Sequence, residues 1–169
     1  MNPLVSLLAN GPLAWGLAAC GLAQLSKLLI ELVVHRRWRP AVLVETGGMP
    51  SSHSALVTGT AAAIGWEQGF DAPLFALASA VAFVVMYDAR GVRRAAGRIA
   101  ARVNALPSSV WGEEGGLQTP LKESLGHSRT EVLVGSLLGP AIALSGLALL
   151  GSPLQIAQSF GWLSALPLA

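Results

Sequence analysis

The chain has 169 residues, of which 53% are hydrophobic and only 12% are charged, and its formal net charge is +2. Because soluble domains carry about 25% charged residues, this composition indicates a membrane protein. The few basic residues are clustered, so nucleic-acid binding is not expected. The single cysteine, Cys20, excludes an intramolecular disulfide, and no Cys/His spacing suggests a zinc site. We therefore expect neither a metal nor a cofactor.

Four apolar stretches are long enough to cross a hydrocarbon core of about 30 Å, which takes roughly 20 helical residues. The predicted spans are 12–34, 51–70, 72–89 and 127–150. A shorter segment, 153–168, is either a fifth span or an interfacial helix. The sequence thus predicts an all-α fold, a polytopic membrane bundle of about five helices in one domain over residues 1–169.

After the third predicted span, arginines recur at steps of three and four residues with apolar residues between them. They are Arg90, Arg93, Arg94, Arg98 and Arg102. This spacing predicts a basic amphipathic helix outside the bundle core. The run 107–116 that follows is rich in serine and glycine and predicts a loop of the kind that often covers a site.

The basic residues also predict an orientation in the membrane. The segment His35–Arg39 follows the first span and the arginine cluster follows the third, while the connection between the second and third spans holds no lysine or arginine. The positive-inside rule places both basic connections in the cytoplasm. We expect an integral protein of the plasma membrane, or of a thylakoid-type membrane, with these helix ends facing the cytoplasm.

This topology brings polar residues from several helix ends to one depth. His53 opens the second span, Asp88 and Arg90 close the third, and His127 opens the fourth. Ionisable side chains at membrane depth are costly and therefore mark a candidate functional site. For the arginines, an ordinary interfacial position is the commoner explanation.

The residues around the two histidines suit phosphate chemistry. The run Gly47–Ser54 (GGMPSSHS) is a turn followed by a helix start, whose N–H groups and dipole can bind phosphate, although serines are also ordinary helix caps. Glu131 follows His127 by one helical turn, where a carboxylate can orient the imidazole or form an ordinary surface pair.

These two runs resemble motifs of a known superfamily. Met49-Pro50-Ser51-Ser52-His53-Ser54 resembles the Pro-Ser-Gly-His motif of the type 2 phosphatidic acid phosphatases, a superfamily that includes vanadium haloperoxidases. Gly126-His127-x-x-x-Glu131 resembles its final His-x-x-x-Asp motif. The tract Tyr87–Arg94 is similar to that of the divergent branch of small membrane proteins, and the resemblance covers roughly residues 20–140.

The resemblance implies a lipid phosphatase. His127 would attack phosphorus and form a phosphohistidine, His53 would protonate the leaving oxygen, and Glu131 would support His127. Ser51 and Ser52, with nearby N–H groups, would hold phosphate oxygens without a metal. The expected substrate is a phospholipid monophosphate, phosphatidylglycerophosphate or phosphatidic acid, or an isoprenoid phosphate. A cytoplasmic site favours the phospholipids.

The cations expected to hold phosphate depart from the superfamily pattern. The interval between Lys27 and the Arg39-Pro40 pair is too long, and Pro120-Leu121 replaces the expected Ser-Arg pair. The predicted substitutes are Lys27, Lys122, and Arg90 or Arg93 with Asp88 as an orienting partner.

Two alternatives follow from the departures. Lys27 and Glu31, one turn apart, form a buried structural pair as readily as part of a site. The alternative function is a non-catalytic lipid-phosphate binding or transport protein. Vanadate-dependent halide oxidation is disfavoured because an incomplete arginine set would hold vanadate poorly. The expected partners are a phosphorylated lipid and the bilayer. A homo-oligomer is left as an open alternative.

Overall fold

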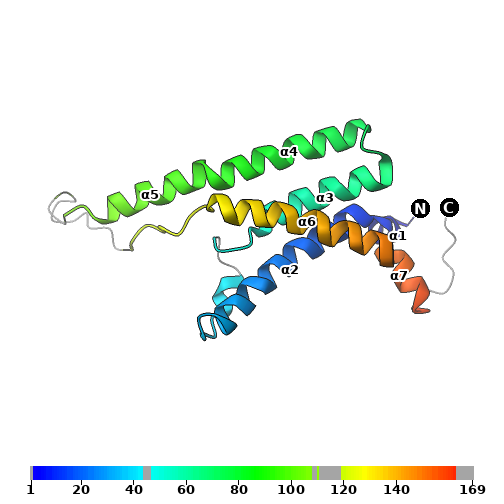
Figure 1. The fold of residues 1–169 in the computed structure, drawn as a ribbon, viewed down its shortest axis with the longest axis horizontal. Helices are drawn as coiled ribbons and strands as arrows, with labels where there is room; N and C mark the ends of the chain where they lie inside the picture. Colours follow the sequence, from blue (N-terminus) through cyan, green and yellow to red (C-terminus); the bar gives the residue numbers. More distant parts are fainter. Residues whose placement is uncertain (1, 44–46, 108–109, 111–118, 163–169) are drawn as a thin grey trace.

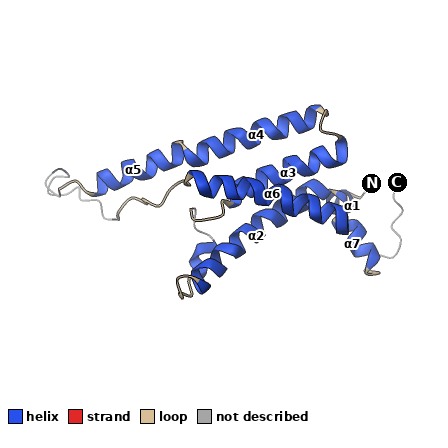
Figure 2. Cartoon of the chain, viewed as in Figure 1, coloured by secondary structure: helices blue, strands red, loops and turns tan. Residues whose placement is uncertain are grey.

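The structure is a computed structural model that describes residues 2–43, 47–107, 110 and 119–162. Within these ranges it contains helices and loops but no strand, which confirms the predicted all-α fold (Figure 2). The elements are α1 (Pro3–Ala9), α2 (Gly11–Val33), a 3-10 helix η1 (Pro40–Leu43), α3 (Ser52–Gln68), α4 (Pro73–Arg90), α5 (Val92–Asn104), α6 (Arg129–Leu150) and α7 (Pro153–Ser159).

Local sequence signals set the helix ends. The Asn10 side chain accepts the N–H of Leu13 and so caps α2. Pro73 begins α4, where its missing N–H removes no helical hydrogen bond. Ser128 caps α6, which places the start of this helix two residues after the predicted start at residue 127. As a result His127 precedes the helix instead of opening it.

The four predicted spans correspond to α2, α3, α4 and α6. Within the described residues, three runs are long and apolar enough to cross a membrane, namely Gly11–Val33, Pro73–Asn104 and Arg129–Ser159. Helix α3 has only 17 residues, about 26 Å at 1.5 Å per residue. This is the lower limit for a membrane span, because the Ser51 cap and the turn at Gly69 end the helix, and the crossing of the membrane by α3 stays a prediction.

The chain ends also differ from expectation. Helix α1, capped by Asn2, was not predicted. In the possible fifth span the described helix, α7, has seven residues, about 10 Å, too short to cross a bilayer. Residues 163–168 of that segment, and most of the predicted covering loop 107–116, lie outside the described residues.

Helix α3 lies at the centre of the bundle and packs against α2, α4 and α6 (Figure 1). Small residues allow this close approach: a Cβ added to Gly59 would lie 3.0 Å from the carbonyl oxygen of Gly139. The most deeply buried cluster is made of alanines, Ala19, Ala23 and Ala55. Such small-residue contacts are typical of helices that pack inside a membrane, where helix association depends on close van der Waals contact.

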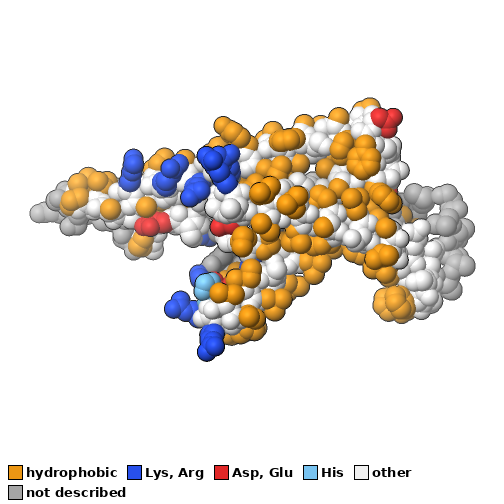
Figure 3. All heavy atoms as spheres, in the orientation of Figure 1, with side chains coloured by type: hydrophobic (Ala, Val, Ile, Leu, Met, Phe, Trp, Pro, Cys, Tyr) orange, Lys and Arg blue, Asp and Glu red, His pale blue; other side chains and the backbone are white. Residues whose placement is uncertain are grey.

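Helices α4 and α5 follow one another almost without a break, and α5 extends beyond the rest of the bundle (Figure 1). Large apolar side chains are exposed on the outer helix faces, as at Phe83 and Leu137. On the face shown in Figure 3, lysines and arginines gather over α5, the α4–α5 junction and the far end of α2. Exposed apolar helices with charges gathered toward one end suit a membrane protein.

Candidate active site

A small cavity lies where α3 and α6 begin and where α4 passes into α5. Its lining residues are His53, Val85, Asp88, Ala89, Arg93, Gly126 and His127. The two histidines therefore face one cavity although 74 positions separate them in the chain. The predicted convergence of both histidines with a cation from the arginine cluster is present in the structure.

His127 is held at the cavity by its backbone. Its side chain is only 3% exposed, and its N–H donates a hydrogen bond of 2.9 Å to the carbonyl oxygen of Ala89 in α4. Gly126 has a φ of +79°, which glycine adopts without strain. A Cβ at Gly126 would collide with the backbone of Arg94 and Ala89. Glycine is thus required for the loop to pack against the α4–α5 junction.

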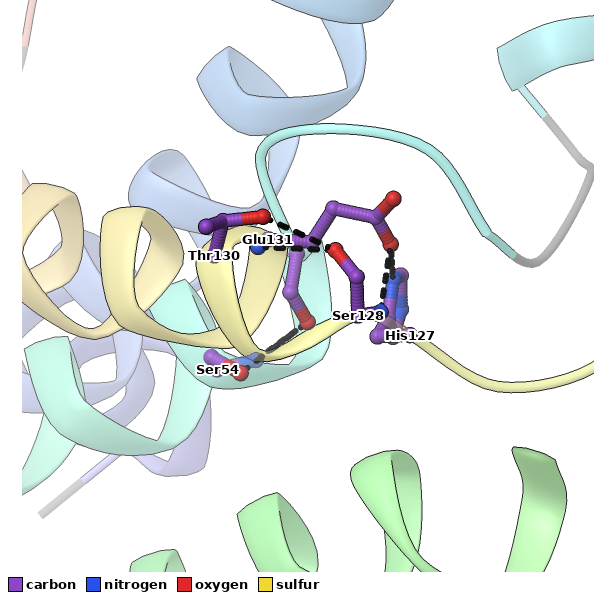
Figure 4. A network of polar contacts seen from close by, with 6 residues as sticks. Ser54, His127, Ser128, Thr130 and Glu131 are labelled. Carbon is purple, nitrogen blue, oxygen red and sulfur yellow. Dashed lines mark hydrogen bonds and ion pairs between the residues drawn. The ribbon is translucent and has the colours of Figure 1, made fainter. Parts of the chain in front are cut away.

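Glu131 fixes the orientation of the His127 ring (Figure 4). The His127 Nδ1 atom lies 2.9 Å from the Glu131 Oε2 atom. The same oxygen accepts the N–H of Ser128 at 3.1 Å, and the Ser128 hydroxyl accepts the N–H of Glu131 at 3.3 Å. This capping box holds the carboxylate in place. With Nδ1 bound to a carboxylate, Nε2 is the ring nitrogen available for chemistry.

His53 is the second residue of α3 and completes the pair. Its ring centroid lies 6.1 Å from that of His127, with an angle of 60° between the ring planes. Arg93 and Asp88 line the same cavity as His53. His53 therefore lies beside an ion pair, in the first turn of a helix.

The two serines before His53 differ in their bonding. The buried Ser51 hydroxyl accepts hydrogen bonds from the Ser54 N–H at 3.3 Å and from the Ser54 hydroxyl at 3.0 Å. The Ser51 N–H donates to the carbonyl oxygen of Glu131 at 3.0 Å, which joins α3 to α6. Ser51 is thus engaged as a helix cap. The N–H groups of Ser52 and His53 have no acceptor among the described residues, as expected in the first turn of a helix.

One arginine of the cluster reaches the cavity. Arg93 Nε donates to Asp88 Oδ2 at 2.6 Å, and both residues line the cavity. The Arg93 side chain is 51% exposed. Of the two arginines that the sequence offered, Arg93 is therefore the one beside the histidines, paired with Asp88 as expected.

The other predicted phosphate-binding cations do not line the cavity. Arg90 lies in an outer groove of the α4–α5 junction. Lys122 is exposed in a segment that the Asn104 side chain ties to the far end of α5 through hydrogen bonds to the backbone of Leu121.

Lys27 does not line the cavity either. It is buried, and its charge attracts the Glu131 carboxylate. Among the described residues no ion pair joins Lys27 to Glu31, so the structural-pair alternative is not observed.

In this state the cavity is small. It offers about 10 Å³ to the centre of a water molecule, which is room for one water. A phosphoryl group would require the half-exposed Arg93 side chain to move. The sequence did not predict that Val85, Ala89 and Gly126 form a wall of the cavity. The feature of the sequence that pointed to this wall was the glycine directly before His127.

Residues 8–142 match the family described as "Divergent PAP2 family". The chain is 39% identical over 154 residues to the Bacillus subtilis (strain 168) protein "Uncharacterized membrane protein YuiD". The alignment covers 83% of this chain and 96% of that protein. No solved structure gives a significant match. The matched region contains both histidines, Glu131 and the arginine cluster.

Proposed function

Because the chain belongs to the divergent PAP2 family, we propose that it is a membrane lipid phosphatase that uses His127 as its nucleophile. One observation carries the proposal: two histidines face a single cavity, and the carboxylate of Glu131 holds Nδ1 of one of them. Two positioned imidazoles can supply the nucleophile and the proton donor of a phosphoryl transfer.

In the first step, the Nε2 lone pair of His127 attacks phosphorus and the bond from phosphorus to the ester oxygen breaks. His53 transfers its proton to that oxygen, so that the lipid leaves as an alcohol. The His127 ring acquires positive charge as the phosphorus–nitrogen bond forms. Glu131 stabilises this charge through the hydrogen bond at Nδ1.

In the second step, water attacks phosphorus while the phosphorus–nitrogen bond breaks. His53, now neutral, accepts a proton from this water and regains its starting state. One phosphomonoester and one water thus yield one alcohol and one inorganic phosphate. The residues proposed for this reaction need no redox partner.

The phosphate oxygens require positive donors. Arg93 is the cation at the cavity, and a guanidinium can bind two phosphate oxygens at once. The N–H groups of Ser52 and His53 lie at the start of α3, where the helix dipole favours an anion. A bound phosphate would compete with Asp88 for Arg93, and this exchange would open the small cavity.

The basic connections favour a cytoplasmic site in a plasma or thylakoid-type membrane. A phosphatase facing that leaflet would act on a lipid made there, phosphatidylglycerophosphate or phosphatidic acid, in preference to an isoprenoid phosphate. This substrate class follows from the predicted membrane orientation, and the opposite orientation would exclude it.

The test is phosphate release by the purified protein from these three lipids in detergent micelles. We expect His127→Ala to reduce the rate to background, since His127 is the imidazole whose Nδ1 the Glu131 carboxylate holds and whose Nε2 is thereby directed to chemistry. The matched control is His35→Ala, which removes an exposed histidine after α2 and should keep full activity. Acid-labile label on the wild type, but not on H127A, after rapid quenching with a radiolabelled substrate would identify the phosphohistidine. Full activity of H127A would exclude the mechanism.

The alternative is a non-catalytic lipid-phosphate binding or transport protein. It is favoured because the described lining of the cavity contains a single arginine, Arg93. Saturable binding of the same lipids without phosphate release or a labelled intermediate would support it.

A further inference from the structure

A second candidate anion-binding site lies on the outer side of the α4–α5 junction. It is an open groove of about 470 Å³ lined by Tyr87, Arg90, Gly91, Arg94, Arg98 and Arg129. The first three arginines are four residues apart and so share one helix face, and Arg129 is added from the start of α6. Figure 3 shows lysine and arginine side chains gathered over this junction and α5.

The groove differs from the histidine cavity in charge balance. Arg93 at the cavity is neutralised by Asp88. In the part of the chain that the structure describes, none of the four groove arginines forms an ion pair with a carboxylate. Four guanidinium groups around one groove repel one another, and an anion bound between them would relieve this repulsion.

The position of the groove suits a lipid. Helix α4 has 18 residues, about 27 Å, close to the thickness of a hydrocarbon core. Its outward side chains near the groove are apolar, with Phe83 72% and Tyr87 74% exposed. Tyrosine is enriched at the membrane interface. The first arginine, Arg90, follows Tyr87 by three residues, and the arginines therefore begin at the expected depth of the lipid phosphates.

We infer that this groove binds the phosphodiester headgroup of an anionic phospholipid of the bilayer, at a site separate from the histidine cavity. Each arginine can bind two phosphate oxygens at once. The acyl chains of the lipid would lie along the exposed apolar face of α4. Among the described residues the lining holds no histidine, serine, cysteine or carboxylate, so the role we assign to it is binding and not cleavage. A volume of about 470 Å³ is within the usual range of small-molecule sites.

The experiment is native mass spectrometry of the purified protein in detergent, titrated with phosphatidylglycerol or with phosphatidylcholine of the same acyl chains. We expect the wild type to retain phosphatidylglycerol preferentially. The double variant Arg94→Gln/Arg98→Gln should bind it roughly 30-fold more weakly, the loss expected for two arginines near an anionic lipid surface. The matched control is Arg36→Gln/Arg37→Gln, which removes the same charge from the loop after α2 and should bind as the wild type does.

Three outcomes would overturn the inference. One is unchanged binding by R94Q/R98Q, and another is an equal loss in both double variants, which would mean that only net charge matters. The third is displacement of the lipid by millimolar inorganic phosphate, which would make free phosphate the ligand. If R94Q/R98Q is not monodisperse, Arg129→Gln tests the same groove from α6, and unchanged binding by it would also count against the site. His127→Ala should bind the lipid normally, so a failure of the proposed reaction leaves this result unaffected.

Discussion

The His53 side chain can be tested through the leaving group. A proton donor is needed when the departing oxygen is a poor leaving group, as in an alkyl phosphate, but not when it is p-nitrophenolate. We expect His53→Ala to lower the rate on an alkyl lipid phosphate by about 100-fold or more, and the rate on p-nitrophenyl phosphate by far less. Initial rates on both substrates measure this difference. An equal loss on both substrates would argue against the role of general acid.

Glu131 has two tasks that one substitution can separate. Its Oε2 atom caps α6 through Ser128 and also holds the His127 ring. Glu131→Gln keeps an oxygen acceptor for the cap but removes the negative charge opposite the imidazole. We expect the rate of phosphate release to fall by at least roughly 100-fold while the melting temperature changes little. Glu123→Gln is the control, because Glu123 does not line the cavity and its side chain accepts a hydrogen bond from Asn104.

Substitutions of Arg90 and Arg93 should affect kcat/KM differently, although the two residues are only one helical turn apart. Arg93 lines the histidine cavity, whereas Arg90 lines the outer groove. We expect Arg93→Ala to lower kcat/KM by about 10-fold to 100-fold, the loss typical of one charge-assisted contact. Arg90→Ala should change kcat/KM by less than about threefold. Steady-state kinetics of both variants on one micellar substrate decide this, and equal losses would contradict the assignment.

The grouping of His53, His127 and Glu131 was predictable from the sequence, because each residue lies at a helix start or one turn from it, where local patterns are informative. It could not distinguish Arg93 from Arg90, because successive side chains turn by about 100° on a helix. Which arginine faces inward therefore depends on how α5 continues from α4. Lys122 was misplaced for a tertiary reason, since Asn104 ties its segment to α5. The catalytic roles of these residues remain predictions.

At the scale of the elements, the contact between α3 and α6 depends on glycines. A Cβ on Gly139 would meet Thr58 Oγ1 at 2.5 Å and the Gly59 nitrogen at 2.8 Å. We expect Gly139→Ala to destabilise the protein by about 1–3 kcal/mol, the usual cost of overpacking. The readout is the melting temperature in one detergent. Gly21→Ala in α2 is the matched control, because a Cβ there meets nothing within 4 Å, and it should be neutral or stabilising.

The main helices were predictable from hydropathy. Hydrophobic runs located both ends of α2, α3, α4 and α6 within two residues, because helices in a membrane are apolar along most of their length. Helix α3 is enclosed by other helices, so its small residues carry packing information that hydropathy does not measure. Helix α1 was missed because seven residues give too little periodicity and its cap, Asn2, is the main signal.

At the scale of the whole molecule, the site lies at one end of the bundle and the α3–α4 turn at the other (Figure 1). Arg37 follows α2 at the same end as the site, whereas Asp71 lies in the α3–α4 turn. If the bundle crosses the bilayer, these two residues face opposite compartments. The arginine-rich end should face the cytoplasm.

Single cysteines in a Cys20→Ala background test this orientation. A membrane-impermeant maleimide should label Asp71→Cys in intact cells and Arg37→Cys only after permeabilisation. Labelling of Arg37→Cys alone in intact cells would reverse the orientation and favour a lipid dephosphorylated outside, such as an isoprenoid phosphate. Labelling of both from one side would mean that the 17-residue α3 does not carry the chain across. The substrate preference depends on this result because a lipid phosphatase can act only on the leaflet that its cavity faces.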